Sequence, residues 1–93
     1  MKYEILKQYG NADCKLASEQ LIRAHHHEGA VSVFAAASNE IRIERPCGKV
    51  TLFDTQAEER WNPDKQAWEW VKRPILGYEK GRVIDGRGKG ANG

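Results

Sequence analysis

The chain has 93 residues, which is enough for one independently folding domain but too few for two separate hydrophobic cores. With 40% hydrophobic and 30% charged residues, its composition is typical of a soluble globular protein and too apolar for a wholly disordered one. The formal net charge of +2 excludes a strongly basic histone-like protein and a strongly acidic nucleic-acid mimic. Two cysteines are too few for a disulfide-dense secreted scaffold.

The first ten residues, MKYEILKQYG, carry charged and polar side chains where a signal peptide needs an unbroken apolar stretch. No apolar run elsewhere approaches the ~20 residues that cross a bilayer. We therefore expect a cytoplasmic protein that does not enter the membrane. Residues 1–7 alternate loosely, with Tyr3 and Ile5 on one side, and this alternation predicts a half-buried strand.

The segment between Asn11 and Gly29 is predicted to form the single helix. Asn11 or Asp13 can accept a backbone hydrogen bond at its start, and Gly29 can adopt the left-handed conformation that ends it. At about 100° per residue, small and apolar side chains gather on one side of this helix and charged ones on the other. Leu16 falls on the polar side, so the apolar stripe is imperfect.

From residue 30 onward the pattern changes to a period of two, which predicts strands over residues 30–37, 40–45 and 49–54. The alternation is clearest in EIRIER, residues 40–45, where both isoleucines lie on one side and the charges on the other. A turn is expected at Ser38-Asn39. The small and β-branched residues of the first of these strands indicate a central position in the sheet.

Residues 60–70 are predicted to form a hairpin whose loop is centred on Asn-Pro-Asp. Trp68 and Trp70 are two residues apart in it and therefore share a face. The alternative is a short helix over residues 55–61, capped by Thr55 and ended by Pro63. The sequence leaves both possibilities open.

These elements predict a small α+β domain over residues 1–84, in the order β-α-β-β-β-β, with an ordered core over about residues 1–72. Four to five antiparallel strands are covered on one face by a single helix. Residues 72–93 hold six of the nine glycines and six basic against two acidic residues. We therefore expect residues 85–93 to be a flexible, basic, glycine-rich tail. Because one helix cannot cover the whole sheet, the other face must be polar, dimeric or functional.

Motifs for metal binding, nucleotide binding and nucleophilic catalysis are incomplete. The side chains of His25–His27 cannot converge on one ion within a helix, where adjacent residues point about 100° apart. Cys14 and Cys47 are interpreted as small hydrophobic side chains rather than as a disulfide or a redox pair. The G-x-G-x-x-G match at residues 88–93 has no helix after it. We therefore expect no enzymatic activity, no cofactor and no metal.

The remaining distinctive feature is a group of aromatic and basic residues in the last third of the chain: Trp61, Trp68, Trp70, Lys72, Arg73 and Tyr78. Such residues anchor protein–protein interfaces. Aromatic rings beside cations also stack on nucleic-acid bases while the cations neutralise phosphates. A third interpretation is that Trp68 and Trp70 simply complete the core of the hairpin.

From these observations we expect a small non-catalytic binding module whose partner is another protein or a second copy of the chain. The contact would use these aromatic and basic residues, the open sheet face or an edge strand. A chain of this size without catalytic motifs suits an accessory or inhibitory protein of a phage or mobile element. The alternative function is weak nucleic-acid binding through the same aromatic residues and the basic tail.

Overall fold

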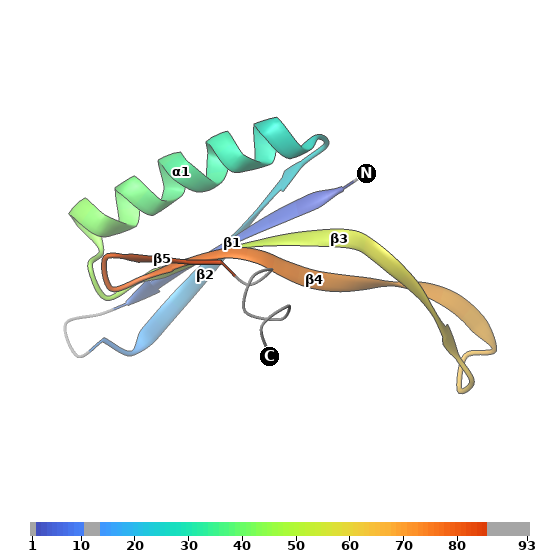
Figure 1. Cartoon of the computed structure of the whole chain (residues 1–93). Helices are drawn as coiled ribbons and strands as arrows, with labels where there is room; N and C mark the ends of the chain where they lie inside the picture. The colour runs from blue at the N-terminus through green and yellow to red at the C-terminus, as the bar shows by residue number, and fades with distance from the viewer. Residues whose placement is uncertain (1, 11–13, 86–93) are drawn as a thin grey trace.

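A computed structural model describes residues 2–10 and 14–85. The elements follow in the order β1 (Tyr3–Gly10), β2 (Leu16–Ala24), α1 (His27–Glu44), β3 (Lys49–Asn62), β4 (Ala67–Glu79) and β5 (Arg82–Asp85). All neighbouring strands run antiparallel, and the sheet order is β2-β1-β3-β4-β5. The helix lies along one face of this sheet (Figure 1). The predicted class, a small α+β domain with one helix over an antiparallel sheet, is confirmed.

The position of the helix along the chain differs from the prediction. Residues 16–24, predicted to be helical, form the edge strand β2. Residues 30–37 and 40–45, predicted to be two strands, lie almost entirely within α1, so the expected turn at Ser38-Asn39 is helical. The order is therefore β-β-α-β-β-β, and β-α-β-β-β-β is wrong.

The burial pattern gives the physical reason for this exchange. The buried residues of α1 recur at the three- and four-residue spacing of a helix: Ala30, Phe34, Ala37, Ser38 and Ile41. Ile41 is fully buried whereas Ile43 is exposed, so the alternation of EIRIER does not reflect a sheet face. Alanine also has the highest helix propensity, which favours a helix at Ala35–Ala37.

The start of α1 depends on the histidines. His26 is the N-cap residue, and its Nδ1 accepts a hydrogen bond of 3.0 Å from the backbone N–H of Gly29. The ring of His27 lies edge-on to that of Tyr3, with the centroids 5.6 Å apart. The histidine run therefore lies at the amino end of the helix. Gly29 lies in the first turn of the helix and not at its carboxyl end, where it was predicted.

The hydrophobic core lies between α1 and the facing side of the sheet. Its members are Tyr3, Ile5, Ala30, Phe34, Ala37, Ile41, Val50, Leu52, Ile75 and Tyr78. Ile5, Ile41, Val50 and Leu52 are the largest side chains that are fully buried, each worth about 1.5–3 kcal/mol of hydrophobic stabilisation. Strands β1, β3 and β4 supply every core residue that comes from the sheet.

An ion pair joins the helix to the sheet beside this core. The Nζ of Lys7 in β1 lies 3.3 Å from a carboxylate oxygen of Glu40 in α1. Burial acts to lower the pKa of Lys7, but hydrogen bonds to Tyr9 and Glu40 outweigh it and raise the pKa above its ordinary value. Lys7 therefore stays charged although it is buried.

Cys14 and Cys47 form a disulfide, so their interpretation as separate hydrophobic side chains is wrong. The bond joins the residues that precede β2 to the turn between α1 and β3, across a sequence separation of 33. Only the folded topology brings these two cysteines together. Gly10 lies against the same turn, since a Cβ at this glycine would come within 2.6 Å of the Cβ of Cys47.

The strands continue beyond residue 72, because β4 ends at Glu79 and β5 at Asp85. Lys80 and Gly81 both have positive φ angles, of 52° and 82°, as the two-residue turn of a tight hairpin requires. The flexible tail predicted over residues 85–93 lies, except for Asp85, outside the described residues.

The double variant C14S/C47S is expected to lose about 3–4 kcal/mol of unfolding free energy. The bond closes a loop across a sequence separation of 33 and so lowers the conformational entropy of the unfolded chain. Urea denaturation followed by circular dichroism measures this loss. A reductant should lower the stability of the wild-type chain to that of the variant and leave the variant unchanged. Equal stability of the oxidised chain and the variant would contradict the prediction.

Candidate functional site

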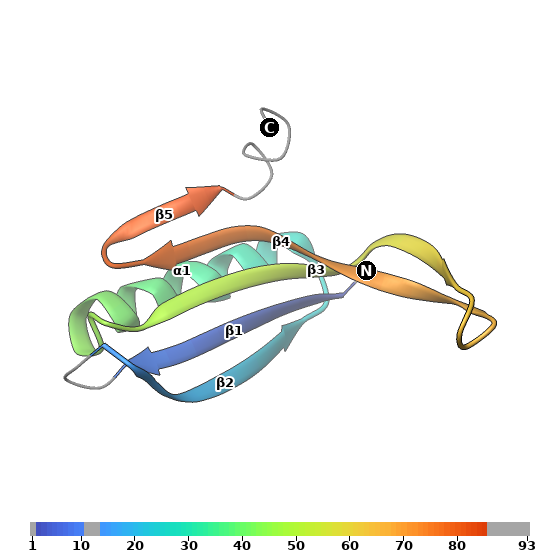
Figure 2. The ribbon, with the colours of Figure 1, turned by 90° about the horizontal axis from the view of Figure 1, so that it is seen from below.

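Strands β3 and β4 continue past the sheet as a two-stranded ribbon. The pairing of β3 with β1 ends at Asp54, whereas β3 and β4 stay paired from Glu58↔Val71 to Asn62↔Ala67. We call residues 58–71 the ribbon. It projects beyond both the helix and the other strands (Figure 2). The hairpin predicted over residues 60–70 is confirmed, and the alternative helix over residues 55–61 is wrong because these residues belong to β3.

The three tryptophans lie on one face of the ribbon, which we call the tryptophan face. Trp61 lies directly opposite Trp68, and Trp70 follows two residues later on β4. The rings of Trp61 and Trp68 meet edge to face, with centroids 5.8 Å apart and an interplanar angle of 66°. Trp61, Trp68 and Trp70 are 48%, 64% and 53% exposed. They do not complete a hairpin core.

The opposite face of the ribbon is polar. Arg60 lies 2.9 Å from the carboxylate of Glu58 on the same strand, and the amide of Asn62 donates to Glu69 at 3.2 Å. Lys65 in the loop pairs with the same Glu69 at 3.5 Å. The ion pairs of the ribbon therefore lie on one side and its indoles on the other, where Glu59 lies directly opposite Trp70.

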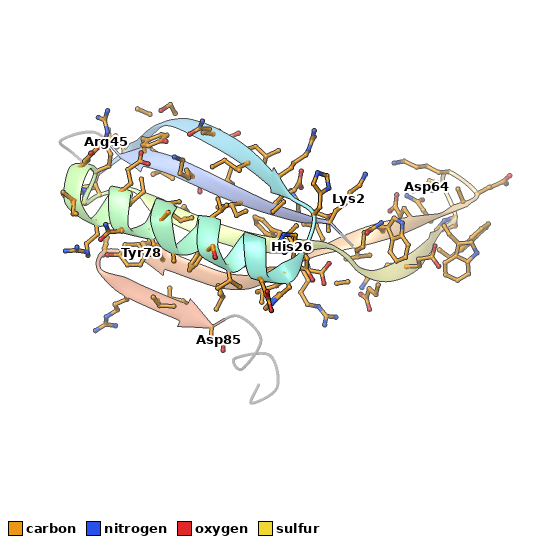
Figure 3. The ribbon with its side chains drawn as sticks, turned by 90° about the horizontal axis from the view of Figure 1, so that it is seen from above. Lys2, His26, Arg45, Asp64, Tyr78 and Asp85 are labelled. Carbon is orange, nitrogen blue, oxygen red and sulfur yellow. A yellow bond between two sulfur atoms is a disulfide. The ribbon has the colours of Figure 1, made fainter. Side chains whose placement is uncertain are left out.

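The loop at the tip holds the two strands in register. The side-chain oxygen of Asn62 accepts hydrogen bonds from the backbone N–H groups of Asp64, at 3.0 Å, and Lys65, at 3.3 Å. Gln66 closes the loop in the left-handed conformation, with a φ of 51°. Figure 3 shows Asp64 at the far end of the ribbon. This turn fixes the cross-strand pairing of Trp61 with Trp68.

The two basic residues predicted to bind lie at the base of the ribbon and are both paired. The Nζ of Lys72 lies 2.8 Å from the carboxylate of Glu4 and 4.7 Å from the ring centroid of Phe53. Arg73 lies 3.7 Å from the carboxylate of Glu58. The remaining predicted site residue, Tyr78, is buried against the core and lies opposite Val50, far along β4 from the ribbon.

Glu4 is the centre of an ion-pair cluster that ties the base of the ribbon to β1 and β2. Its second carboxylate oxygen lies 3.4 Å from the Nε of Arg23. The hydrogen bond from Lys72 holds the pKa of Glu4 below its ordinary value, helped by Arg23 and opposed by partial burial. This carboxylate therefore stabilises the fold above the pKa of the unfolded chain and loses that contribution as the pH falls through the folded value.

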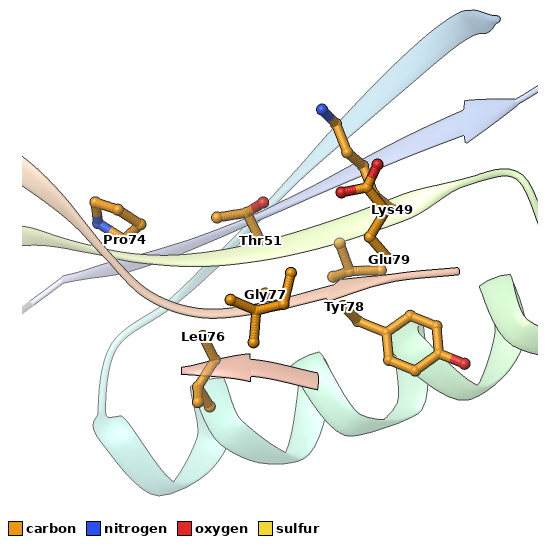
Figure 4. Close-up of a pocket in the computed structure, with 9 residues that line it drawn as sticks. Lys49, Thr51, Pro74, Leu76, Gly77, Tyr78 and Glu79 are labelled. Carbon is orange, nitrogen blue, oxygen red and sulfur yellow. The ribbon is translucent and has the colours of Figure 1, made fainter. Parts of the chain in front are cut away.

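The sheet face opposite the helix is a second candidate surface, after the tryptophan face. The sequence predicted only that this face is not covered by the helix. One row of paired positions crosses all five strands: Leu21, Leu6, Thr51, Gly77 and Ile84. Gly77 has no side chain, and a hollow of about 260 Å³ lies beside it, lined in part by Thr51, Pro74 and Ile84. Figure 4 shows this hollow beside the β3–β4 pair. The sequence shows which residues of a strand share a face, but the row also depends on the register in which neighbouring strands pair.

Within residues 2–10 and 14–85, no three His, Cys, Asp or Glu side chains gather as metal ligands would. In the same part of the chain, no helix combines the length and the hydropathy needed to cross a lipid bilayer. Comparison of the chain with protein-family models, with curated proteins and with solved structures finds no match.

The variant Glu4→Gln is expected to lose about 0.5–1 kcal/mol of unfolding free energy at neutral pH, because it keeps the shape of the side chain but removes the charge that Lys72 and Arg23 face. Its stability should also fall less steeply than that of the wild type as the pH is lowered toward 3. Thermal unfolding across this pH range measures both effects. Glu59→Gln, at an exposed position of β3, is the matched control and should keep the wild-type profile. Parallel profiles for Glu4→Gln and the wild type would refute the assignment.

Proposed function

We propose that the chain is a small non-catalytic module that binds another protein through the tryptophan face of the ribbon. The observation that carries this proposal is the grouping of three half-exposed indoles on one side of a projecting hairpin. Leaving side chains of this size in water forfeits much of their hydrophobic stabilisation. Tryptophan is among the residues most enriched at the energetic centres of protein interfaces.

The shape of the ribbon supports the same function. A two-stranded ribbon that extends beyond the sheet can enter a groove of a partner without displacing any part of its own core. Its paired charges face away from the indoles. A contact on the tryptophan face would then bury apolar surface at its centre and leave polar side chains at its rim, as in known protein interfaces.

The charges of the ribbon and of its base favour a protein over a nucleic acid. Residues 55–73 contain four basic and four acidic residues. Each of the four cations, in Arg60, Lys65, Lys72 and Arg73, lies within 3.7 Å of a carboxylate. Phosphates would have to compete with these carboxylates, which reduces the electrostatic gain that supports nucleic-acid binding. Weak nucleic-acid binding through the indoles and the predicted basic tail is the alternative function.

A module of this kind suits an accessory or inhibitory protein of a phage or mobile element, which acts by occupying the surface of a larger protein. The small size of the chain supports this assignment. Inhibition would require only that the ribbon reach a functional groove of the partner. No catalytic step enters the proposal.

The cytoplasmic location expected from the sequence stays a prediction, and the disulfide weighs against it. Disulfides persist in oxidising compartments and are rare in the reducing cytosol. The bond between Cys14 and Cys47 therefore favours an oxidising compartment. Thiol alkylation in intact cells followed by mass spectrometry should find both cysteines protected. Complete alkylation of both would support the cytoplasmic location instead.

Single replacement of Trp68 or Trp70 by alanine is expected to weaken binding to the protein partner about 30-fold, the effect of losing one central interface residue. The partner is first isolated by stoichiometric co-purification from the native host, and its affinity is then measured by calorimetry. Val83→Ala, at an exposed apolar position of β5, is the matched control and should bind like the wild type.

Fluorescence titration with single-stranded oligonucleotides tests the alternative function. We expect no tryptophan quenching at moderate salt. Quenching that weakens when residues 85–93 are deleted would favour nucleic-acid binding over the proposed function. Retention of full partner affinity by both tryptophan variants would also reject the proposed function.

A further inference from the structure

The two edges of the sheet differ in what they offer a partner strand. β5 has four residues, whereas β2 has nine. Within residues 2–10 and 14–85, β2 pairs with β1 along one side and with no strand along the other. The other side of an edge strand presents a row of backbone N–H and C=O groups that a further strand can pair with. Residues 16–24 contain neither proline nor glycine, the residues that most often interrupt such pairing.

The side chains of β2 are complementary to themselves. If two copies of β2 pair antiparallel with Leu21 opposite Leu21, then Glu19 of each copy lies opposite Arg23 of the other. These three residues lie on the open face of the sheet, because they pair with Gln8, Leu6 and Glu4 of β1. Opposite charges at directly paired positions stabilise antiparallel strands, and like charges destabilise them.

Neighbouring two-fold registers lose this complementarity. With the two-fold axis at Gln20, Glu19 lies opposite Leu21 of the second copy. With the axis at Ile22, Leu21 lies opposite Arg23 instead. The register centred on Leu21 is the one in which the apolar residue meets its own copy and each charge meets the opposite charge. A two-fold contact of this kind is closed and stops at the dimer.

We propose that the chain forms a two-fold dimer in which β2 pairs antiparallel with β2 of a second copy. The pairing joins two five-stranded sheets into one sheet of ten strands. Both helices then lie on the same side of this sheet. On the other side, the row of Leu21, Leu6, Thr51, Gly77 and Ile84 that crosses each sheet becomes continuous through the pair of Leu21 side chains.

The residues that make this contact are accessible. Leu21 is 45% exposed, and the side chain of Arg23 is 74% exposed. Arg23 uses its Nε toward Glu4, at 3.4 Å, and the guanidinium has two terminal nitrogens with which to reach a further carboxylate. Glu19 is exposed on the same face. The ion pair within one copy and the ion pair between copies can therefore form together.

Analytical ultracentrifugation over a wide range of protein concentration tests the dimer. The wild-type chain should dimerise. Leu21→Lys and Leu21→Asp place like charges opposite each other at the two-fold axis, so each variant alone should show a dissociation constant raised about tenfold or more. An equimolar mixture of the two variants should recover dimers, because the introduced ammonium and carboxylate groups then attract each other across the axis. Circular dichroism checks that each variant is folded.

A second set of variants tests the register. Glu19→Arg alone should weaken the dimer, and E19R/R23E, which exchanges the charges, should restore it relative to the single variant. Val83→Lys on β5 is the matched control and should dimerise like the wild type. A wild-type chain that stays monomeric throughout, or a mixture of the two Leu21 variants that stays monomeric, would overturn the proposal.

The triple variant W61A/W68A/W70A separates this proposal from the proposed function. It should lose the protein partner and keep the dimer, because the ribbon lies outside the β2 edge. The Leu21 variants should show the reverse, losing the dimer and keeping the protein partner. Loss of the dimer in the triple variant would assign self-association to the tryptophan face and overturn pairing through β2.

Discussion

The structure depends on the packing of one 18-residue helix against a sheet that is wider than the helix. The helix buries the facing side chains of β1, β3 and β4, which supply all the core residues that come from the sheet. It leaves uncovered the opposite face, including Leu21 of the edge strand β2, and the extension of β3 and β4 beyond the sheet. These uncovered regions hold most of the exposed large apolar side chains. The core therefore determines where the chain can contact other molecules.

The sequence was sufficient to predict the fold class but not the place of the helix. The number of segments with a helical or a strand-like period was enough to predict one helix and several strands. Residues 16–24 and 27–44, however, each fit both the 3.6-residue period of a helix and the two-residue period of a strand in part. Ile41 and Ile43 alternate like strand residues, yet only Ile41 reaches the core. Tertiary packing determines which of the two segments is helical, because Phe34 and Ala37 pack against the sheet when residues 27–44 form the helix. Local pattern alone does not contain that contact.

The candidate site was predictable to the extent that it depends on local pairing. The Asn-Pro-Asp loop and the two-residue spacing of Trp68 and Trp70 were enough to predict the hairpin and its shared face. The pairing of Lys72 with Glu4 and the burial of Tyr78 depend on residues distant in sequence. The sequence therefore did not show that Lys72 is ion-paired and Tyr78 is buried, whereas the tryptophans are exposed. The same reason applies to the disulfide, because its cysteines are 33 residues apart in the sequence and lie together only in the folded chain.

The continuity of β3 and β4 has a mechanical consequence. The strands that carry Trp61 and Trp70 at one end carry Val50, Leu52 and Ile75 in the core at the other. A pull on the tip by a bound partner is therefore transmitted along two backbones directly to the most deeply buried part of the domain. There it acts along the strands, against a ladder of hydrogen bonds loaded in shear. Pulling the hairpin out of the sheet would therefore require breaking the pairing of β3 with β1 and of β4 with β5.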